Sequence, residues 1–185
     1  MTVEQLEKLI AGAVSLVKAG KADDLQPPDA EIDLESTALD AAGRVLRGAE
    51  AMRRLIEDAD EPWKRQILWV DNRPDNNIYE RRTFESFGVE FTLALSTDEA
   101  LRILDGRKFA AIISDMGRRE GRREGLKLLD AVRSKDKSTP FYIYAGPWSQ
   151  APEHQREATE RGAQGATNAA NELIDMVTTS LRLND

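Results

Sequence analysis

The chain contains no cysteine and only one histidine, His154, among its 185 residues. The lack of cysteine excludes disulfides, thiol catalysis and zinc or iron sites that depend on thiolate ligands. Basic residues are in the minority, with 26 Lys and Arg against 33 Asp and Glu, which gives a formal net charge of -7. Because an acidic chain is repelled by phosphate-rich surfaces, we expect neither nucleic acid nor a membrane among its partners.

Long apolar runs are absent as well. No run approaches the ~18 apolar residues that a membrane-spanning helix needs, and the N-terminus lacks a basic segment followed by an apolar core. We therefore predict a cytoplasmic location. A chain of this length can form one full core and an extension, but it is short for two ordinary domains.

Residues 1–62 read as a helical extension. Apolar side chains recur at helical spacing over residues 2–19 and again over residues 34–58, and a proline-containing connector separates the two segments. Two such helices cannot bury their apolar stripes on each other alone. We predict that the hairpin pairs with a second copy in a homodimer, with packing on the chain's own second part as the alternative.

From residue 66 onward, short apolar strands alternate with amphipathic helices, which is the pattern of an α/β domain with a parallel sheet. The predicted strands are 67–70, 91–94, 110–114, 141–145 and 165–167. The predicted helices are 76–87, a helix capped by Ser96 with Glu99, 125–134, a helix starting near Pro152, and 170–183. Right-handed crossovers would make this a doubly wound sheet of five parallel strands.

Two of the predicted strands end on an acid. The stretch ILWVDN places Asp71 directly after the first strand, and Asp115 follows the third. The carboxyl ends of buried parallel strands are where such folds build their sites. Packing alone does not explain two acids at these positions, so we expect Asp71 and Asp115 to share a site.

Four short motifs, VDN at 70–72, SDMG at 114–117, PFYIYAG at 140–146 and RGAQGAT at 161–167, resemble the receiver domain of bacterial response regulators. The resemblance covers residues 66–183. It implies a flavodoxin-like sheet in the order 2-1-3-4-5, with the site at the ends of the first and third strands. It also implies a two-component signalling role with a histidine kinase or other protein partner, whose identity the sequence does not give.

Carried over residue by residue, the resemblance makes Asp115 the phospho-acceptor. Asp71 and the backbone carbonyl of Gly117 match ligands of a Mg²⁺ ion. Asn72 stands where the family usually has a second acid, and an amide oxygen binds a hard cation without the charge that makes the site strong. We therefore expect Mg²⁺ to bind weakly.

Two further positions depart from the family pattern. Ala145 stands where a Thr or Ser hydroxyl is expected, and the family's lysine falls at Asn168 or Ala169, with no lysine anywhere in 165–185. We predict a pseudo-receiver, a signalling module that acts through protein–protein interaction with weak or no phosphorylation. It is more readily understood as a binding module than as an enzyme.

The loop after Asp115 is rich in arginine. Arg118, Arg119, Arg122 and Arg123 lie there beside Glu120 and Glu124. The loop could replace the missing lysine or grip an anion. We favour a solvated loop in which the mixed charges neutralise each other.

An enzyme on the same type of fold is the alternative function. A nucleotide or NAD hydrolase of the Toll/interleukin-receptor type would take its catalytic carboxylate from Glu80, Glu120 or Glu124, and no motif selects one. A haloacid-dehalogenase-like phosphatase on Asp71 is excluded because Arg73 occupies the position where that family needs an acid.

The remaining polar and aromatic candidates have ordinary explanations. We expect Asp75, Asn76 and Asn77 to cap the first helix of the domain and His154 to be a solvated helix residue. Trp69 and Trp148 are expected to be packing residues.

Overall fold

The computed structural model describes residues 61–183. The predicted helices at 2–19 and 34–58 lie outside these residues. The strands are β1 (Gln66–Val70), β2 (Glu90–Ala94), β3 (Ala111–Ser114), β4 (Phe141–Tyr144) and β5 (Gly165–Thr167). The helices are α3 (Ile78–Glu85), α4 (Thr97–Leu104), α5 (Glu124–Arg133), α6 (Pro152–Glu160) and α7 (Ala170–Leu183), with 3-10 turns η1 (Pro62–Arg65), η2 (Pro74–Asn77) and η3 (Pro147–Gln150).

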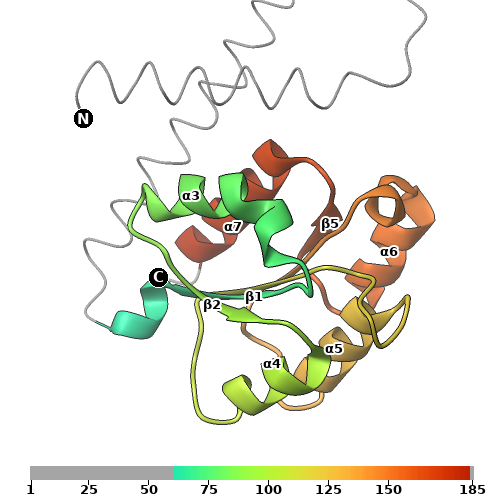
Figure 1. Cartoon of the computed structure of the whole chain (residues 1–185), viewed down its shortest axis with the longest axis horizontal. Helices are drawn as coiled ribbons and strands as arrows, with labels where there is room; N and C mark the ends of the chain where they lie inside the picture. The colour runs from blue at the N-terminus through green and yellow to red at the C-terminus, as the bar shows by residue number, and fades with distance from the viewer. Residues whose placement is uncertain (1–60, 184–185) are drawn as a thin grey trace, which may run out of the picture. The chain divides into compact units, whose positions relative to one another are not determined.

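The five strands form one parallel sheet in the order β2-β1-β3-β4-β5. Helices α3 and α7 cover one face of the sheet, and α4, α5 and α6 cover the other (Figure 1). This arrangement confirms the predicted doubly wound α/β fold and its strand order. The connection from β1 to β2 and the return to β3 leave the carboxyl ends of β1 and β3 side by side.

The core consists of two apolar layers, one on each face of the sheet. Alternate strand residues contribute to the layer under α4, α5 and α6, among them Leu68, Val70, Ile112 and Ile143. The other strand residues face α3 and α7, among them Ile67, Trp69, Ile113 and Tyr142. Because both faces are covered at the centre of the sheet, β1, β3 and β4 are mostly apolar, whereas the edge strand β2 carries the exposed Glu90 and the partly exposed Thr92. Trp69 is confirmed as a packing residue, with only 1% of its surface exposed.

Helix α4 begins with the predicted cap. The Ser96 hydroxyl accepts a hydrogen bond from the Glu99 backbone N–H at 3.1 Å. The Glu99 carboxylate in turn accepts from the Leu95 backbone N–H at 2.8 Å. One N–H that the helix leaves free, that of Glu99, and the N–H of Leu95 just before the cap are thereby satisfied, which fixes where the chain turns from β2 into α4.

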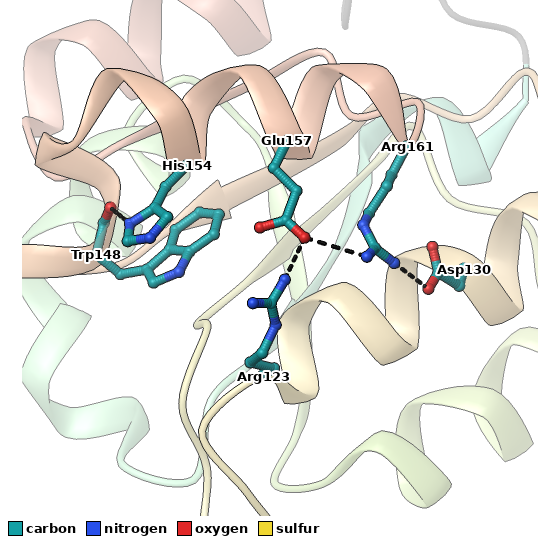
Figure 2. Close-up of polar contacts among 6 residues, drawn as sticks. All are labelled: Arg123, Asp130, Trp148, His154, Glu157 and Arg161. Carbon is teal, nitrogen blue, oxygen red and sulfur yellow. Dashed lines mark hydrogen bonds and ion pairs between the residues drawn. The ribbon is translucent and has the colours of Figure 1, made fainter.

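Charged side chains join α5 to α6 on the surface (Figure 2). Glu157 of α6 accepts hydrogen bonds from Arg123 and Arg161, and Arg161 also donates to Asp130 of α5 at 2.6 Å. These side chains are partly exposed, so the pairs orient the two helices more than they stabilise them.

His154 lies in α6, as predicted, but it is half-buried and not simply a solvated helix residue. Its ring stacks on the Trp148 ring with centroids 4.7 Å apart, and its Nδ1 lies 3.0 Å from the Trp148 carbonyl oxygen (Figure 2). Because a carbonyl oxygen only accepts, Nδ1 carries the hydrogen in this contact. The turn η3 brings Trp148 against the first turn of α6, and the indole also packs on the apolar core, as predicted for a packing residue.

Candidate functional site

A cavity of about 650 Å³ opens at the carboxyl ends of the central strands. Asp71, directly after β1, and Asp115, directly after β3, both lie in its wall. The other lining residues are Asn72, Arg73, Asn76, Asn77, Glu80, Gly117, Arg118, Arg119, Tyr144, Ala145, Gly146 and Asn168. The strand order thus brings the two strand-end acids into one site, because β1 and β3 are paired neighbours.

Asp71 is nearly buried and already has two donors within the chain. Its Oδ1 accepts from the Arg73 backbone N–H at 2.6 Å, and its Oδ2 accepts from the Asn77 side-chain amide at 2.5 Å. Asn77 occupies the N-cap position of α3 but makes no capping hydrogen bond. The prediction that Asn77 is a cap is therefore wrong, because its amide turns toward the buried carboxylate that needs a donor.

The same expectation fails for the two residues before Asn77. Asp75 and Asn76 lie inside the turn η2, ahead of the α3 cap position, and no side-chain cap is made at the start of η2. Pro74 delays the helix by starting this turn, so α3 begins at Ile78. Asn76 lines the cavity, whereas Asp75 is exposed.

Asp115 is half-buried, and its Oδ1 accepts from the Met116 backbone N–H at 2.8 Å. Burial raises the pKa of the Asp115 carboxyl, and the nearby charge of Asp71 raises it further. The backbone N–H groups of Met116 and Gly117 and the charge of Arg118 oppose this rise. The two acids therefore repel each other, and a cation placed between them would relieve that repulsion.

Arg118 contradicts the expectation of a solvated arginine loop. The side chain is 6% exposed, and its guanidinium donates to Ser114 Oγ at 2.8 Å, to the Asp115 backbone oxygen at 2.8 Å and to Thr97 Oγ1 at 2.7 Å. These bonds go to hydroxyls and to a main-chain carbonyl, not to the Asp115 carboxylate. Arg118 therefore fixes the loop.

The network continues from Thr97 into α5. Thr97 Oγ1 donates to Glu124 Oε2 at 3.0 Å, and Lys127 Nζ donates to Glu124 Oε1 at 2.6 Å. The Lys127 hydrogen bond and the bond from Thr97 lower the pKa of the buried Glu124 carboxyl. Arg118 therefore connects the Asp115 loop to both α4 and α5.

The other loop arginines match the solvated interpretation. Arg119, Arg122 and Arg123 are exposed, and Arg123 pairs with Glu157 of α6. Among these three, only Arg119 lines the cavity. The positions of Arg119, Arg122 and Arg123 give no sign that one of them replaces a lysine at the end of β5.

Glu80 and the half-buried Tyr144 form a polar pair in the cavity wall. The Tyr144 hydroxyl donates to Glu80 Oε1 at 2.9 Å, and burial together with the Glu80 charge raises the pKa of the Tyr144 hydroxyl. The sequence suggested Glu80 only as a catalytic carboxylate, and the hydroxyl of Tyr144 is not among the predicted site residues. Glu80 lies four residues before the buried Phe84, which places it on the sheet-facing stripe of α3, and the sequence shows this spacing.

The ends of β4 and β5 present small or neutral side chains. Ala145, Gly146 and Asn168 line the cavity there, and Ala169 does not. None of the lining residues is a serine, a threonine or a lysine. In the described part of the wall, no Ser or Thr hydroxyl and no Lys ammonium therefore lies at the ends of β4 and β5, where the resemblance to receiver domains predicts them.

The three candidate carboxylates of a hydrolase do not gather in one place. Glu80 pairs with Tyr144 in the wall, Glu120 is exposed in the loop, and Glu124 is held by Thr97 and Lys127. Only Glu80 lines the cavity. The geometry gives no support to a hydrolase site.

The donor set suits a hard cation weakly. Asp71 and Asp115 supply two carboxylates, Asn72 an amide and Gly117 a backbone carbonyl, all in the cavity wall. Within residues 61–183, no three His, Cys, Asp or Glu side chains are grouped closely enough to hold a metal ion.

The same residues contain no helix with the length and apolar character needed to cross a membrane.

Comparisons with known proteins agree on the fold. No protein-family model matches the chain, and no curated protein matches its sequence. The receiver domain of the Francisella response regulator 1452 is 22% identical with a TM-score of 0.58, covering 65% of this chain and 98% of that one. The receiver domain of NtrX from Brucella abortus is 25% identical with a TM-score of 0.56, covering 63% and 98%.

A third solved structure, a two-component response regulator from Clostridium difficile, is 20% identical with a TM-score of 0.57 and covers 65% of this chain and 98% of that one. Each of the three covers about two thirds of this chain and nearly the whole of its own length. Residues 61–183 therefore have the fold of a response regulator receiver domain.

Proposed function

We propose that residues 61–183 act as a receiver-type signalling module with a degenerate phosphate site, which works mainly through protein–protein interaction. One observation carries the proposal. The cavity keeps Asp71 and Asp115 together, yet the ends of β4 and β5 present Ala145 and Asn168 to it. The candidate acceptor carboxylate is thus present, whereas the hydroxyl and the ammonium that would contact a phosphoryl group are replaced by an alanine and an asparagine side chain.

Transfer of a phosphoryl group to a carboxylate needs fixed donors around the transferred oxygens. Ala145 cannot donate, and the Asn168 amide carries no charge. Arg118 is a buried cation in the cavity wall, and its hydrogen bonds to Ser114, Thr97 and the Asp115 carbonyl hold it on the loop. Stabilisation of the phosphoryl oxygens should therefore be poor, and phosphorylation slow.

A bound Mg²⁺ ion would be held by Asp71, Asp115 and the Gly117 carbonyl, with Asn72 as a neutral fourth donor. When bound, such an ion neutralises charge on the phosphate oxygens. Asp71 must share with it two oxygens that already accept from Arg73 and Asn77. Weak binding is the expected consequence, and Asn72→Asp should tighten it.

The test is incubation of the full chain with acetyl phosphate and Mg²⁺, followed by intact-protein mass spectrometry and by NMR. We expect slow, substoichiometric phosphorylation that is lost in Asp115→Asn, with few amide shifts outside the cavity. The double variant Asn72→Asp, Ala145→Thr should be phosphorylated faster. Rapid stoichiometric phosphorylation of the unaltered chain, with a change of oligomeric state, would show an ordinary phosphorylation switch and contradict the proposal.

A further inference from the structure

Arg118 is a buried cation in the cavity wall whose hydrogen bonds lead away from the phosphate site. Its side chain is 6% exposed, and its guanidinium donates at 2.7 Å to Thr97 Oγ1, on the first residue of α4. We propose that a gain or loss of charge at Asp115 is transmitted to the start of α4 through Arg118 and Thr97. This inference rests on the proposed function, because it names the element that responds to the candidate phospho-acceptor.

The first link, from Asp115 to Arg118, is electrostatic. Within the described residues the guanidinium bonds to the Asp115 backbone oxygen, at 2.8 Å, and not to the carboxylate. The two charges still act on each other, since the Arg118 charge opposes the rise that burial causes in the pKa of the Asp115 carboxyl. Charges interact more strongly where water is excluded, so a change of charge at Asp115 alters the force on this nearly buried guanidinium.

The second link is a hydrogen-bond chain with one direction. A guanidinium only donates, so Thr97 Oγ1 accepts from Arg118 and has its single hydrogen left for another group. That hydrogen goes to Glu124 Oε2 at 3.0 Å, and Lys127 completes the chain by donating to Glu124 Oε1 at 2.6 Å. Glu124 is only 3% exposed, so little water is present to replace a lost donor. Displacement of the guanidinium therefore changes the bonding of buried groups in α4 and α5.

The Arg118 side chain can shift while its backbone stays in place. The main chains of Arg118 and Gly121 exchange two hydrogen bonds, of 2.9 and 3.0 Å, which hold the loop. The Arg118 Nε–H, in contrast, is buried and meets no acceptor in the part of the chain described. A buried donor without a partner is unfavourable, so the guanidinium does not leave a fully satisfied arrangement when it moves.

The end of β4 offers no comparable route. Ala145 has only a methyl side chain and Gly146 has none, so neither can make a side-chain hydrogen bond to a group on Asp115. Asn168 also lines the cavity, but between residues 61 and 183 no hydrogen bond links its side chain to another residue. A change at Asp115 therefore finds a continuous polar chain only on the side of α4 and α5.

The start of α4 is built to respond as a unit. Ser96 and Glu99 close the cap on either side of Thr97, with 3.1 Å between the Ser96 hydroxyl oxygen and the Glu99 backbone nitrogen. A force on Thr97 therefore acts on the whole first turn of the helix. The few amide signals outside the cavity that respond to a change at Asp115 should be those of this turn.

The test compares the NMR spectrum of the full chain with that of Asp115→Asn, which removes the charge without any phosphorylation. We expect the amide signals of residues 97–99 to shift roughly twice as far as those of residues 145–146, or more. The same comparison in a Thr97→Val background should reduce the α4 shifts about threefold or more, because valine lacks the hydroxyl. Thr97→Ser keeps the hydroxyl and should preserve them.

The matched control is Thr159→Val at an exposed position on α6, which should leave the α4 shifts unchanged. Two results would overturn the relay. One is the absence of α4 shifts in Asp115→Asn, and the other is α4 shifts of undiminished size in the Thr97→Val background, which would then arise without the hydroxyl. Either result leaves the proposed function standing, whereas rapid stoichiometric phosphorylation contradicts the proposed function without touching the relay.

A second measurement needs no change at Thr97 and serves if Thr97→Val does not fold. The guanidinium NMR signals of Arg118 should shift in Asp115→Asn. Those of Arg133, whose guanidinium is held by three backbone carbonyls on the loops before β4 and β5, should not. Unmoved Arg118 signals, or equal shifts of both arginines, would reject the coupling.

Discussion

A single arginine holds the backbone that carries the candidate phospho-acceptor. Arg118 spans three acceptors in different directions, Ser114 Oγ, Thr97 Oγ1 and the Asp115 carbonyl. A planar guanidinium can do this, whereas a lysine ammonium on a flexible stem cannot reach all three at once. Burial lowers the pKa of the Arg118 guanidinium, and the charges of nearby acids, Glu120 and Asp115 first, oppose that effect. These acids help to keep the buried guanidinium charged.

We therefore expect Arg118→Lys to be a costly change. It should lower the free energy of unfolding by about 1–3 kcal/mol, because buried acceptors lose their donor. The matched control is Arg119→Lys at the exposed neighbouring position, which should change stability by less than about 0.5 kcal/mol. Urea denaturation of both variants checks this, and equal effects would show that the Arg118 hydrogen bonds do not stabilise the loop.

Asp115 gives a prediction with a defined pH dependence. Its pKa is raised in the folded protein, so the unfolded chain gives up this proton more readily and ionisation favours unfolding. Asp115→Asn removes the charge that burial and Asp71 oppose. We expect the variant to be more stable at pH 7 by roughly 0.5–1.5 kcal/mol, after discounting for the solvent that reaches a half-buried group.

At low pH the stability gain of Asp115→Asn should become smaller without changing sign. Below the pKa of the unfolded group both states are protonated, so the advantage of Asp115→Asn is lost as the pH falls through the Asp115 titration. Thermal unfolding at several pH values measures the trend, with the exposed Asp105→Asn as the control. Lower stability of Asp115→Asn at pH 7 would show that its contacts with Arg118 and the backbone outweigh the repulsion.

At this scale the sequence predicted some site residues and missed others for a physical reason. Asp71 and Asp115 stand out because a charge interrupts an apolar strand, which is a local pattern. The roles of Asn77, Arg118 and Glu80 depend on partners that are remote in the sequence or compete with a local motif. Capping propensity and charge patterning describe the neighbourhood of a residue and not the buried group that it meets after folding.

At the scale of elements, the first turn of α5 packs against the loop that carries Asp115. The Gly125 N–H donates to the Met116 carbonyl at 3.0 Å. A Cβ at Gly125 would lie 2.8 Å from the Asp115 backbone oxygen and 3.0 Å from the Met116 Cα. Those neighbours are main-chain atoms, so they cannot move aside without displacing the site.

Gly125→Ala should therefore destabilise the domain by about 1–3 kcal/mol, the usual cost of overpacking. It should also shift the amide signals of Asp115 and Met116. The control is Gly106→Ala, where an added Cβ meets nothing within 4 Å and little change or a slight gain in stability is expected. A neutral Gly125→Ala, in thermal unfolding and in the NMR spectrum, would mean that α5 does not constrain the loop.

The elements themselves were largely predictable from the sequence, because the central strands are apolar runs that the helices cover and the helices between them are amphipathic. The strand-end positions and the Ser96 cap follow from local chemistry. The start of α3 was predicted two residues early because Pro74 begins a separate 3-10 turn. The stacking of His154 on Trp148 needed the path of η3, which no periodicity in the sequence specifies.

At the scale of the whole molecule, residues 61–183 hold a complete sheet with both faces covered and a cavity at its carboxyl edge. The domain fold therefore closes its own core within the described residues. The amphipathic segments predicted at 2–19 and 34–58 each carry an apolar stripe. Such stripes need another apolar surface on which to pack.

The last prediction concerns those segments, which lie outside the described residues. A two-helix hairpin leaves the far side of each apolar stripe in water, and a second copy related by two-fold symmetry would cover both as a four-helix bundle. We expect the full chain to be a dimer at micromolar concentration and a chain starting at Asp60 to be a monomer. Light scattering on both proteins measures this. A monomeric full chain, or a truncated chain that still dimerises, would exclude the N-terminal segments as the dimer interface.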